Sequence, residues 1–268
     1  MGKFICCSHI GKRLNYEDNY YLNGQYMSVE VQKKMEDNHL HFICGDSYSD
    51  IQIFAVSDGM GGHNAGEVAS RMCVSKIALA SNDVLKLNSI EEISEYIQNI
   101  IFEINNEIVI LSHKNSDLQG MGATLVLLII YKDEYAILNI GDSRAYCVKS
   151  DGIAQITKDH TEGQRLIDLG ILTRKELRDF PARKNLSRYI GYNQPGYNLS
   201  ADIYYPKMDE GVLMLCSDGL YDALTDCRIM QIFNLEKNLE DIGKRLVEEA
   251  ALTNNADNIT VILIPIRK

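Results

Sequence analysis

The feature that most constrains the fold is a set of continuously apolar segments, two of which run directly into the same triplet, Ser-Asp-Gly. One covers residues 53–56 and continues into Ser57, Asp58 and Gly59, and the other covers residues 212–216 and continues into the triplet at 217–219. Short runs that stay apolar, instead of alternating with polar residues, are typical of strands covered on both faces. The sequence therefore predicts a buried sheet core with further layers on either side.

Strands and helices are predicted in groups along the chain. Apolar, β-branched or aromatic runs predict strands at 3–9, 20–26, 51–56, 124–131, 135–140, 144–148, 212–217 and 259–264. Apolar residues at helical spacing predict helices at 68–77, at 90–111, where Ser89 and Glu92 form a capping box, and at 239–250. Groups of helices between groups of strands predict an α+β layered fold.

The composition is that of one soluble globular domain covering residues 1–268. The chain is 46% hydrophobic and 24% charged, which is enough apolar surface to close a core. Its 37 acidic and 27 basic residues give a formal net charge of -10, which argues against a nucleic-acid partner. The seven cysteines include no CxxC pair and fit neither a disulfide framework nor a zinc site. Because the longest apolar run is also too short to span a bilayer, we expect a cytoplasmic protein with no membrane partner.

Residues 161–191 form a segment of a different kind between predicted strands. Gly170 is typical of a helix stop, Thr173 and Glu176 form a second capping box, and Pro181 ends the short helix that this box begins. The segment is rich in basic side chains, namely Arg165, Arg174, Lys175, Arg178, Arg183, Lys184 and Arg188. Two interpretations remain open for it: a solvated surface, or a region that meets anionic substrates.

Carboxylates recur where predicted strands begin or end, at Glu17, Asp18, Asp58, Asp142, Asp218 and Asp257. Strand ends on a rigid scaffold aim side chains at a common point, as a functional site requires. Carboxylates gathered there repel one another unless cations hold them, and oxygen donors without a His or Cys cluster favour Mg²⁺ or Mn²⁺. A single Asp-Gly is more often a hairpin turn. Both copies here lead into helix-like sequence, so we interpret Asp58 and Asp218 as ligands.

Eight motifs occur in order across nearly the whole chain: GKRLNYEDNYYL, FAVSDGMGGHNAGEVAS, GMGATLVLLII, LNIGDSRAYCV, ITKDHT, LSRYIG, VLMLCSDGLYDAL and NADNITVILI. This set resembles the metal-dependent protein serine/threonine phosphatases of the protein phosphatase 2C (PPM) family, specifically the bacterial branch. The resemblance implies a four-layer αββα sandwich of two antiparallel β-sheets flanked by helices. It also implies that residues 161–191 are a variable flap beside the active site, which influences the choice of substrate.

The resemblance further implies a centre that binds two Mn²⁺ or Mg²⁺ ions per chain, with a third ion at a weaker site. Asp58 is expected to bridge the two ions, and Glu17 and the carbonyl of Gly59 to bind one of them. Asp218 and Asp257 are expected to bind the other ion.

Three further residues match positions of the family pattern. Asp142, together with Asp218, resembles the weaker third-metal site of bacterial members. Asp18 is expected to orient a metal-bound water from outside the ligand set, and Arg13 to grip the substrate phosphate with its guanidinium fork. The implied reaction is direct hydrolysis, without a covalent enzyme intermediate, by a water whose pKa the two ions lower.

The general acid is the part of this mechanism that the sequence leaves open. Many eukaryotic members have a histidine directly after Asp-Gly, where this chain has Met60. His63 is a candidate general acid, with a surface or structural role as the alternative, and a metal-bound water is another source of the proton. We interpret Asp159 and His160 as structural residues that orient the flap.

Two other functions compete with this one. A catalytically silent phosphatase fold, used as a regulatory or binding module, would predict lost metal ligands, yet all the acidic positions are present. A two-metal phosphodiesterase or nuclease would predict histidine ligands or a basic stripe, which the sequence lacks. We therefore expect phosphorylated protein substrates, among them a Ser/Thr kinase and its targets, and a monomeric enzyme.

Overall fold

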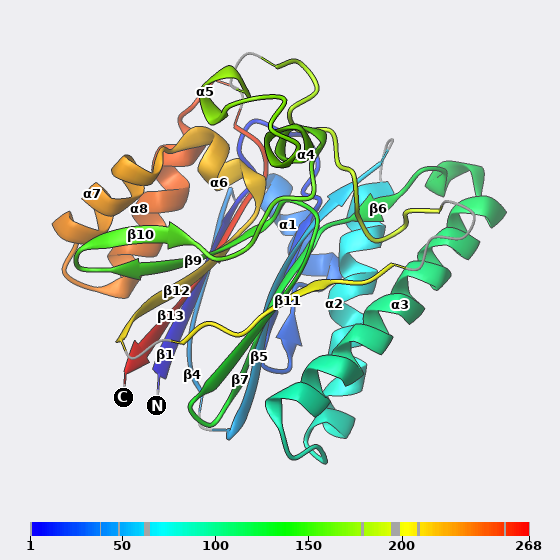
Figure 1. The fold of residues 1–268 in the computed structure, drawn as a ribbon, viewed down its shortest axis with the longest axis horizontal. Helices are drawn as coiled ribbons and strands as arrows, with labels where there is room; N and C mark the ends of the chain where they lie inside the picture. The colour runs from blue at the N-terminus through cyan, green and yellow to red at the C-terminus, as the bar shows by residue number, and fades with distance from the viewer. Residues whose placement is uncertain are drawn as a thin grey trace.

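The computed structural model describes residues 2–37, 39–47, 49–61, 65–177, 180–193, 199–207, 210–254 and 256–267. Two antiparallel sheets pack face to face, and helices cover the outer face of each sheet (Figure 1). This arrangement confirms the predicted α+β fold and the four-layer αββα sandwich.

The two sheets are built from strands that are distant in sequence. The first sheet has the order β10-β9-β12-β13-β1-β4, with β1 (Gly2–His9), β4 (Leu40–Ser47), β9 (Arg144–Lys149), β10 (Gly152–Gln155), β12 (Glu210–Cys216) and β13 (Ile259–Arg267). The second sheet has the order β11-β8-β7-β5-β2-β3, with β2 (Asp18–Leu22), β3 (Gln25–Tyr26), β5 (Ile51–Met60), β7 (Leu125–Tyr131), β8 (Glu134–Ile140) and β11 (Asp202–Tyr204). The short strand β6 (Gly122–Ala123) pairs with the end of β5.

The helices divide between the two outer layers. Helices α2 (Ala65–Val84) and α3 (Ile90–Lys114) cover the second sheet, and α6 (Asp218–Ala223), α7 (Asp226–Leu235) and α8 (Leu239–Ala251) cover the first. The flap carries α4 (Glu162–Asp168) and α5 (Arg174–Leu177) above one end of the sandwich (Figure 1), while α1 (Val29–Asp37) and the 3-10 turn η1 (Ser116–Leu118) lie in connections. No helix among the described residues has both the length and the apolarity needed to cross a membrane.

Alternating residues along each strand fill the apolar layers on its two sides. On β1, Phe4 and Cys6 belong to the core between the sheets, while Ile5 and Cys7 belong to the core beneath α8. Phe4 packs edge-on against Phe54 of β5, with 5.1 Å between the ring centroids. Because both faces of such strands are buried, their sequences are continuously apolar, as predicted.

Helix α3 follows its predicted pattern closely. The isoleucines at its helical spacing, 90, 93, 97, 101, 104 and 108, are all buried. Ser89 Oγ accepts a hydrogen bond from the Glu92 N–H at 3.1 Å, and the Glu92 carboxylate accepts one from the Asn88 N–H at 3.0 Å. The predicted capping box therefore forms, with the carboxylate reaching one residue further back than the N-cap.

The single strand predicted at 20–26 is wrong: this segment is a hairpin of β2 and β3. Asn23 and Gly24, the two residues of the turn, have φ values of 49° and 108°. Left-handed values at both positions are those of a type I′ turn, for which Asn-Gly is the favoured sequence. The dipeptide was therefore a turn signal inside an apolar run.

Several elements at the margins of the fold were not predicted, among them α1, β4, β10, β11 and α7. The strands β4, β10 and β11 each lie at an edge of a sheet. An edge strand is partly exposed and carries polar residues, so it lacks the continuous apolar run that marked the central strands.

Candidate metal centre

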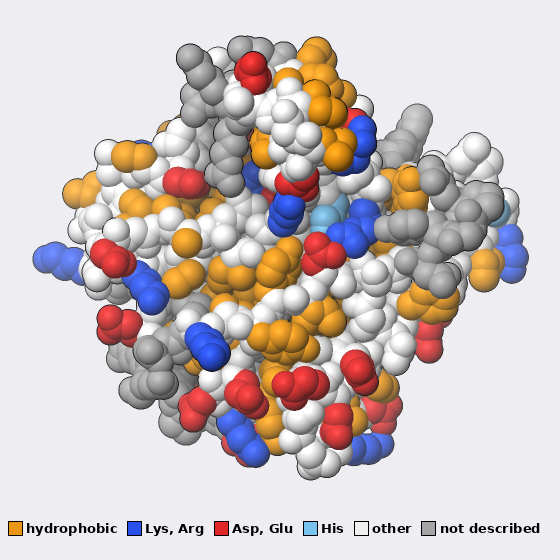
Figure 2. Space-filling model, in the orientation of Figure 1, with side chains coloured by type: hydrophobic (Ala, Val, Ile, Leu, Met, Phe, Trp, Pro, Cys, Tyr) orange, Lys and Arg blue, Asp and Glu red, His pale blue; other side chains and the backbone are white. Residues whose placement is uncertain are grey.

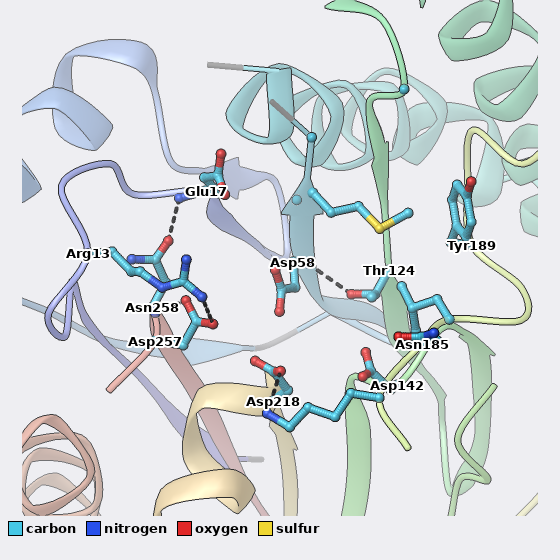
Figure 3. A pocket seen from close by; sticks show the side chains of 16 residues that line it. Arg13, Glu17, Asp58, Thr124, Asp142, Asn185, Tyr189, Asp218, Asp257 and Asn258 are labelled. Carbon is cyan, nitrogen blue, oxygen red and sulfur yellow. Dashed lines mark hydrogen bonds and ion pairs between the residues drawn. The ribbon is translucent and has the colours of Figure 1, made fainter. Parts of the chain in front are cut away.

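A cavity of about 630 Å³ opens at one end of the sandwich, beneath the flap (Figure 3). Carboxylates from separate segments line it: Glu17, Asp58, Asp142, Asp218 and Asp257. The flap contributes Lys184, Asn185, Leu186 and Tyr189 to the same cavity. The fold therefore collects the predicted acidic residues from both halves of the chain at one place.

Asp58 lies within β5 and not at its end, which corrects the prediction that this strand stops at residue 56. Beyond Val56 the strand leaves β7 and continues alongside β6, where Gly59 pairs with Ala123. The Asp58 N–H donates to Thr124 Oγ1 at 3.0 Å, and the Thr124 N–H donates to the Asp58 carbonyl at 2.8 Å. These bonds hold the Asp58 backbone while its carboxylate points into the cavity (Figure 3).

Gly59 is needed for the close approach of β5 to α2. A Cβ atom at Gly59 would lie 2.0 Å from the Gly66 carbonyl oxygen and 2.8 Å from the Glu17 carbonyl oxygen. The Gly59 N–H also donates to the Glu17 carbonyl at 3.2 Å. Any side chain at Gly59 would therefore push Glu17 and α2 away from the strand that carries Asp58.

Asp18 is fully buried behind the cavity. Its Oδ2 accepts hydrogen bonds from Ser217 Oγ at 2.7 Å and from Thr260 Oγ1 at 2.8 Å, so it links β2 to β13 and to the start of α6. Its other oxygen, Oδ1, is buried without a hydrogen-bond partner, and so is Oδ1 of Asp218, the first residue of α6. Buried carboxylate oxygens without donors are rare in folded proteins and indicate a missing cation or water.

Asp257 forms an ion pair with Arg13 across the start of β13, with 2.5 Å between Arg13 Nη2 and Asp257 Oδ2. Asn258 ties the two segments together, since its Nδ2 donates to the carbonyls of Ile10 and Asn15 and its Oδ1 accepts from the Glu17 N–H at 2.7 Å. Asn258 thus places both Arg13 and Glu17 at the cavity (Figure 3).

Asp142 occupies the turn between β8 and β9, where it is only 7% exposed. Gly141 before it has φ 100°, a value that favours glycine, and the Asp142 carbonyl accepts a hydrogen bond from Tyr221 Oη at 3.0 Å. The turn and this bond hold Asp142 at the cavity wall near α6.

Several carboxylates around the cavity have raised pKa values, as expected for acidic groups that bind cations. Burial raises the pKa of Glu17, Asp18 and Asp142 to about 7, and repulsion from neighbouring carboxylates adds to the shift. Burial, followed by repulsion from Asp18 and Asp218, raises the pKa of Asp58 well above its ordinary value, and burial, followed by repulsion from Asp257, raises the pKa of Asp218. A divalent cation would favour the ionised form of each of these groups.

The donor set fits a hard divalent cation. All the candidate side chains offer oxygen, two of their buried oxygens have no donor, and no histidine lines the cavity among the described residues. As the side chains are placed, no three Asp, Glu, His or Cys groups of the described part of the chain surround one point closely enough to hold an ion. Binding would therefore require the carboxylates to rotate toward one another.

The structure adds residues to the site that were not singled out from the sequence, namely Thr124, Asn258, Ser217 and Thr260, and of the basic residues noted in the flap it brings Lys184 to the cavity. Lys184 Nζ lies 3.7 Å from Asp218 Oδ2 and also forms an ion pair with Asp222. Asn258 directly follows Asp257 in the NADNIT motif, so its position beside that aspartate was the available signal, whereas Thr124 lies in the GMGATL motif, which contains no aspartate. No local pattern marked Ser217 or Thr260 as partners of Asp18.

The candidates for the general acid are only partly described. Met60 lines the cavity directly after Gly59, while His63 lies outside the described residues. His160 is buried and does not line the cavity; its ring contacts Gly141, Arg188 and Asp202. These contacts join the flap to the turn that carries Asp142.

Known proteins resemble this chain in sequence and in fold. Residues 27–259 match the family model described as Protein phosphatase 2C. The serine/threonine phosphatase stp of Listeria innocua is 34% identical over 213 residues, which cover 79% of this chain and 83% of that protein.

Solved structures agree with this result. The serine/threonine phosphatase Stp1 from Staphylococcus aureus superposes with a TM-score of 0.83 at 27% identity, covering 100% of this chain and 96% of that one. The catalytic domain of the phosphatase PstP, solved in complex with 2 manganese ions, shares the fold at 24% identity with a TM-score of 0.75, covering 100% of this chain and 99% of that domain. From its sequence, its sandwich fold and its acidic cavity, the chain belongs to the protein phosphatase 2C family of metal-dependent serine/threonine phosphatases.

Proposed function

We propose that this protein removes phosphate from phosphoserine and phosphothreonine in protein substrates, by direct attack of water and without a covalent enzyme intermediate. The observation that carries the proposal is the cavity beneath the flap, where buried and partly buried carboxylates with raised pKa values face a basic residue, Arg13. A site of this kind binds a phosphate together with divalent cations. The names of the relatives support the same activity.

The proposed cofactors are two Mn²⁺ or Mg²⁺ ions per chain, with a third at a weaker site. Asp58 would bridge the two ions, with Glu17 and the Gly59 carbonyl on one side and Asp218 and Asp257 on the other. Asp142 would share the weaker site with Asp218. The positions of these residues around one cavity support the assignment, as do the 2 manganese ions bound by PstP.

When bound, the cations supply a water of lowered pKa as the nucleophile and stabilise negative charge on the phosphoryl oxygens. Asp18 would accept a hydrogen bond from that water and orient it, since Asp18 Oδ1 has no other partner. Arg13 would bind two phosphate oxygens through its guanidinium fork. Its side chain is 58% exposed, which leaves it free to turn from Asp257 toward a substrate.

The leaving oxygen must receive a proton as the phosphate ester bond breaks. Met60 carries no proton to donate, so the proton would come from a water in the cavity or from His63. A His63→Gln variant that keeps the activity at low pH would assign the proton to water.

The test is phosphate release from a phosphothreonine peptide in the presence of Mn²⁺ or Mg²⁺. Activity should stop with a chelator, and Asp58→Asn should lower kcat/KM by about 1,000-fold or more, because the variant loses the bridging charge. Asp133→Asn is the matched control, since Asp133 lies on the exposed turn between β7 and β8 and should retain wild-type activity. Robust turnover by Asp58→Asn would overturn the assignment.

The physiological setting is part of the proposal. We infer a single phosphatase domain over residues 1–268 with the flap at about 161–191, a monomer, and a cytoplasmic location. The substrates would include a Ser/Thr kinase and its targets. Unchanged phosphothreonine levels in the phosphoproteome of a deletion strain would contradict this, and light scattering would test for a monomer.

A further inference from the structure

Lys184 is a flap residue whose side chain reaches the acidic cavity. Its Nζ lies 3.7 Å from Asp218 Oδ2 and pairs with Asp222 Oδ2, so it joins the flap to α6. The Lys184 side chain is 49% exposed, whereas that of Asp218 is 17% exposed. A partly solvated ammonium group therefore stands against an enclosed carboxylate at the mouth of the cavity.

The backbone around Lys184 is anchored to the rest of the flap. The Glu162 N–H at the start of α4 donates to the Asn185 carbonyl at 2.8 Å, and Leu186 forms a β-bridge with Thr161. A Cβ atom on Gly163 would lie 2.7 Å from the Arg183 carbonyl oxygen, so α4 packs directly on this stretch. The side chain of Lys184 can therefore move while its backbone stays in place.

Arg13 and Lys184 line the same cavity, and each of them pairs with one of its carboxylates. Arg13 pairs with Asp257, and Lys184 pairs with Asp218. These two carboxylates are the ones proposed to bind the same cation. A divalent cation held by both would take their oxygens and repel the neighbouring guanidinium and ammonium groups, which would then be available to an anion.

Lys184 is well suited to such an exchange. Its ammonium group sits on a flexible four-carbon stem and donates hydrogen bonds in any direction. Asp222, its other partner, does not line the cavity and is not a proposed ligand, so it can keep Lys184 at the rim after Asp218 is occupied. The cavity that Lys184 lines is the one that Arg13 lines.

We propose that Lys184 is a second phosphate-binding residue of this cavity, which pairs with Asp218 when no cation is bound there and with the substrate phosphate when the cation is in place. The inference rests on the proposed function, because it takes Asp218 as a metal ligand and a phosphate as the substrate group. In this proposal the flap takes part in phosphate binding through the side chain of Lys184.

The test measures binding, so that it does not depend on turnover. Calorimetry gives the Kd of Mn²⁺ for the wild type and for Lys184→Gln, and then the Kd of inorganic phosphate for the Mn²⁺-loaded proteins. The variant should bind phosphate about tenfold more weakly, the loss expected for one partly exposed charge-assisted hydrogen bond. It should bind Mn²⁺ about threefold more tightly, because the competing ammonium is gone.

Two further variants separate this role from a structural one. Lys184→Arg keeps the charge and should bind phosphate within about twofold of the wild type. Lys158→Gln is the matched control: Lys158 pairs with Asp168 on α4 at 2.7 Å and does not line the cavity, so both Kd values should stay unchanged.

Wild-type phosphate affinity in Lys184→Gln would overturn the inference. Equal losses in Lys184→Gln and Lys184→Arg, with a lower Tm in both, would also overturn it, because they would assign Lys184 to holding the flap. If the wild type binds Mn²⁺ and phosphate as expected but releases no phosphate from peptides, the proposed function fails while the role of Lys184 in binding phosphate stands.

Discussion

Two polar clusters lie next to each other in this molecule, and they differ in how their charges are matched. In the acidic centre, buried and partly buried carboxylates outnumber basic groups, and two of their oxygens have no hydrogen-bond partner. In the neighbouring cluster, Asp159 accepts two hydrogen bonds from Arg144, at 2.9 and 2.6 Å. The Arg144 guanidinium also lies 3.5 Å from the centroid of the Tyr221 ring. The charges of the second cluster are therefore paired within the protein.

His160 belongs to the second cluster, in which the charges are paired within the protein. On the face of the molecule drawn in Figure 2, basic and acidic side chains likewise lie next to one another. The Gly141 N–H donates to His160 Nδ1 at 3.0 Å, so Nδ1 carries no proton and the neutral ring donates from Nε2 to Asp202 Oδ2 at 3.0 Å. Arg188 lies against the ring and pairs with Asp202 at 2.6 Å. Burial and then Arg188 lower the pKa of His160, which keeps the ring neutral. These contacts agree with the structural role expected for Asp159 and His160.

The comparison separates polar residues that serve the fold from those that serve the reaction. Removing one member of a buried ion pair destabilises the protein, because the other charge is left buried without a partner. A buried charge without a partner destabilises the protein until a ligand arrives. The same substitution, Asp to Asn, should therefore have opposite effects on stability in the two clusters.

The largest change in stability is expected for Asp159→Asn. The variant leaves Arg144, whose side chain is 20% exposed, without its carboxylate partner. We expect the free energy of unfolding to fall by about 3 kcal/mol, as for other broken buried ion pairs. Urea denaturation of the chelated protein measures this loss, and calorimetry should show an unchanged Mn²⁺ stoichiometry. A loss of Mn²⁺ sites without a loss of stability would reverse the assignment of the two clusters.

The next effect is the response of the chelated protein to pH. In the folded chain the pKa values of Asp18 and Asp142 are raised to about 7 from the ordinary value of 3.8. Their favourable contribution to folding is therefore complete below the unfolded value and is lost as pH rises through about 7. We expect the free energy of unfolding to fall between pH 5 and pH 8. Saturating Mn²⁺ should flatten this slope, and a stability that rises with pH in chelator would contradict the prediction.

Asp58→Asn should stabilise the chelated protein while it abolishes activity. The amide needs no proton to be neutral, so it removes the cost that burial and the neighbouring carboxylates impose on Asp58. At pH 8 the free energy of unfolding should rise by about 1 kcal/mol. Thermal melts with and without Mn²⁺ provide the measurement. Destabilisation of the size expected for Asp159→Asn would show that Asp58 is held by partners within the protein.

The last effect, expected for Arg188→Gln, is similar in size to that of Asp58→Asn and opposite in sign. The Asp202 side chain is 37% exposed, so water replaces most of what the lost ion pair contributed. We expect a loss of about 1 kcal/mol, and the pKa of His160 should rise toward its ordinary value because Arg188 no longer lowers it. An NMR titration of His160 checks the shift; an unchanged or lowered pKa would contradict the proposed arrangement of this cluster.

Most of the central fold could be predicted because the residue types along a central strand reflect the burial of both of its faces. The predicted strands at 3–9, 124–131 and 259–264 correspond to β1, β7 and β13, since burial on both faces forces a continuous apolar run. Edge strands such as β4 and β11 were not predicted, because they are only partly buried and carry polar residues that interrupt the apolar run. The strand at 51–56 was predicted too short, because Asp58 and Gly59 read as a strand end although β5 continues to Met60.

The acidic positions of the site were also visible in the sequence, through their places beside apolar runs. The residues that hold these acids in place by hydrogen bonds were not visible in the sequence. Thr260 and Ser217 meet Asp18 from positions about 200 residues or more away in the chain, and Asn258 joins the segments of Arg13 and Glu17 across the start of β13. Hydrogen bonds between distant segments leave no periodic or local pattern to detect.

The sequence by itself determined the layered sandwich, the family and the set of acids, because apolar periodicity and ordered motifs are local properties of the chain. The tertiary structure decided which charged and polar groups have partners within the protein. It pairs Asp159 with Arg144, leaves Asp18 and Asp218 each with an unpaired oxygen, and brings Arg13 and Lys184 to one cavity. The physical reason is that electrostatic balance depends on distances between residues from separate strands and loops, which only the folded chain establishes.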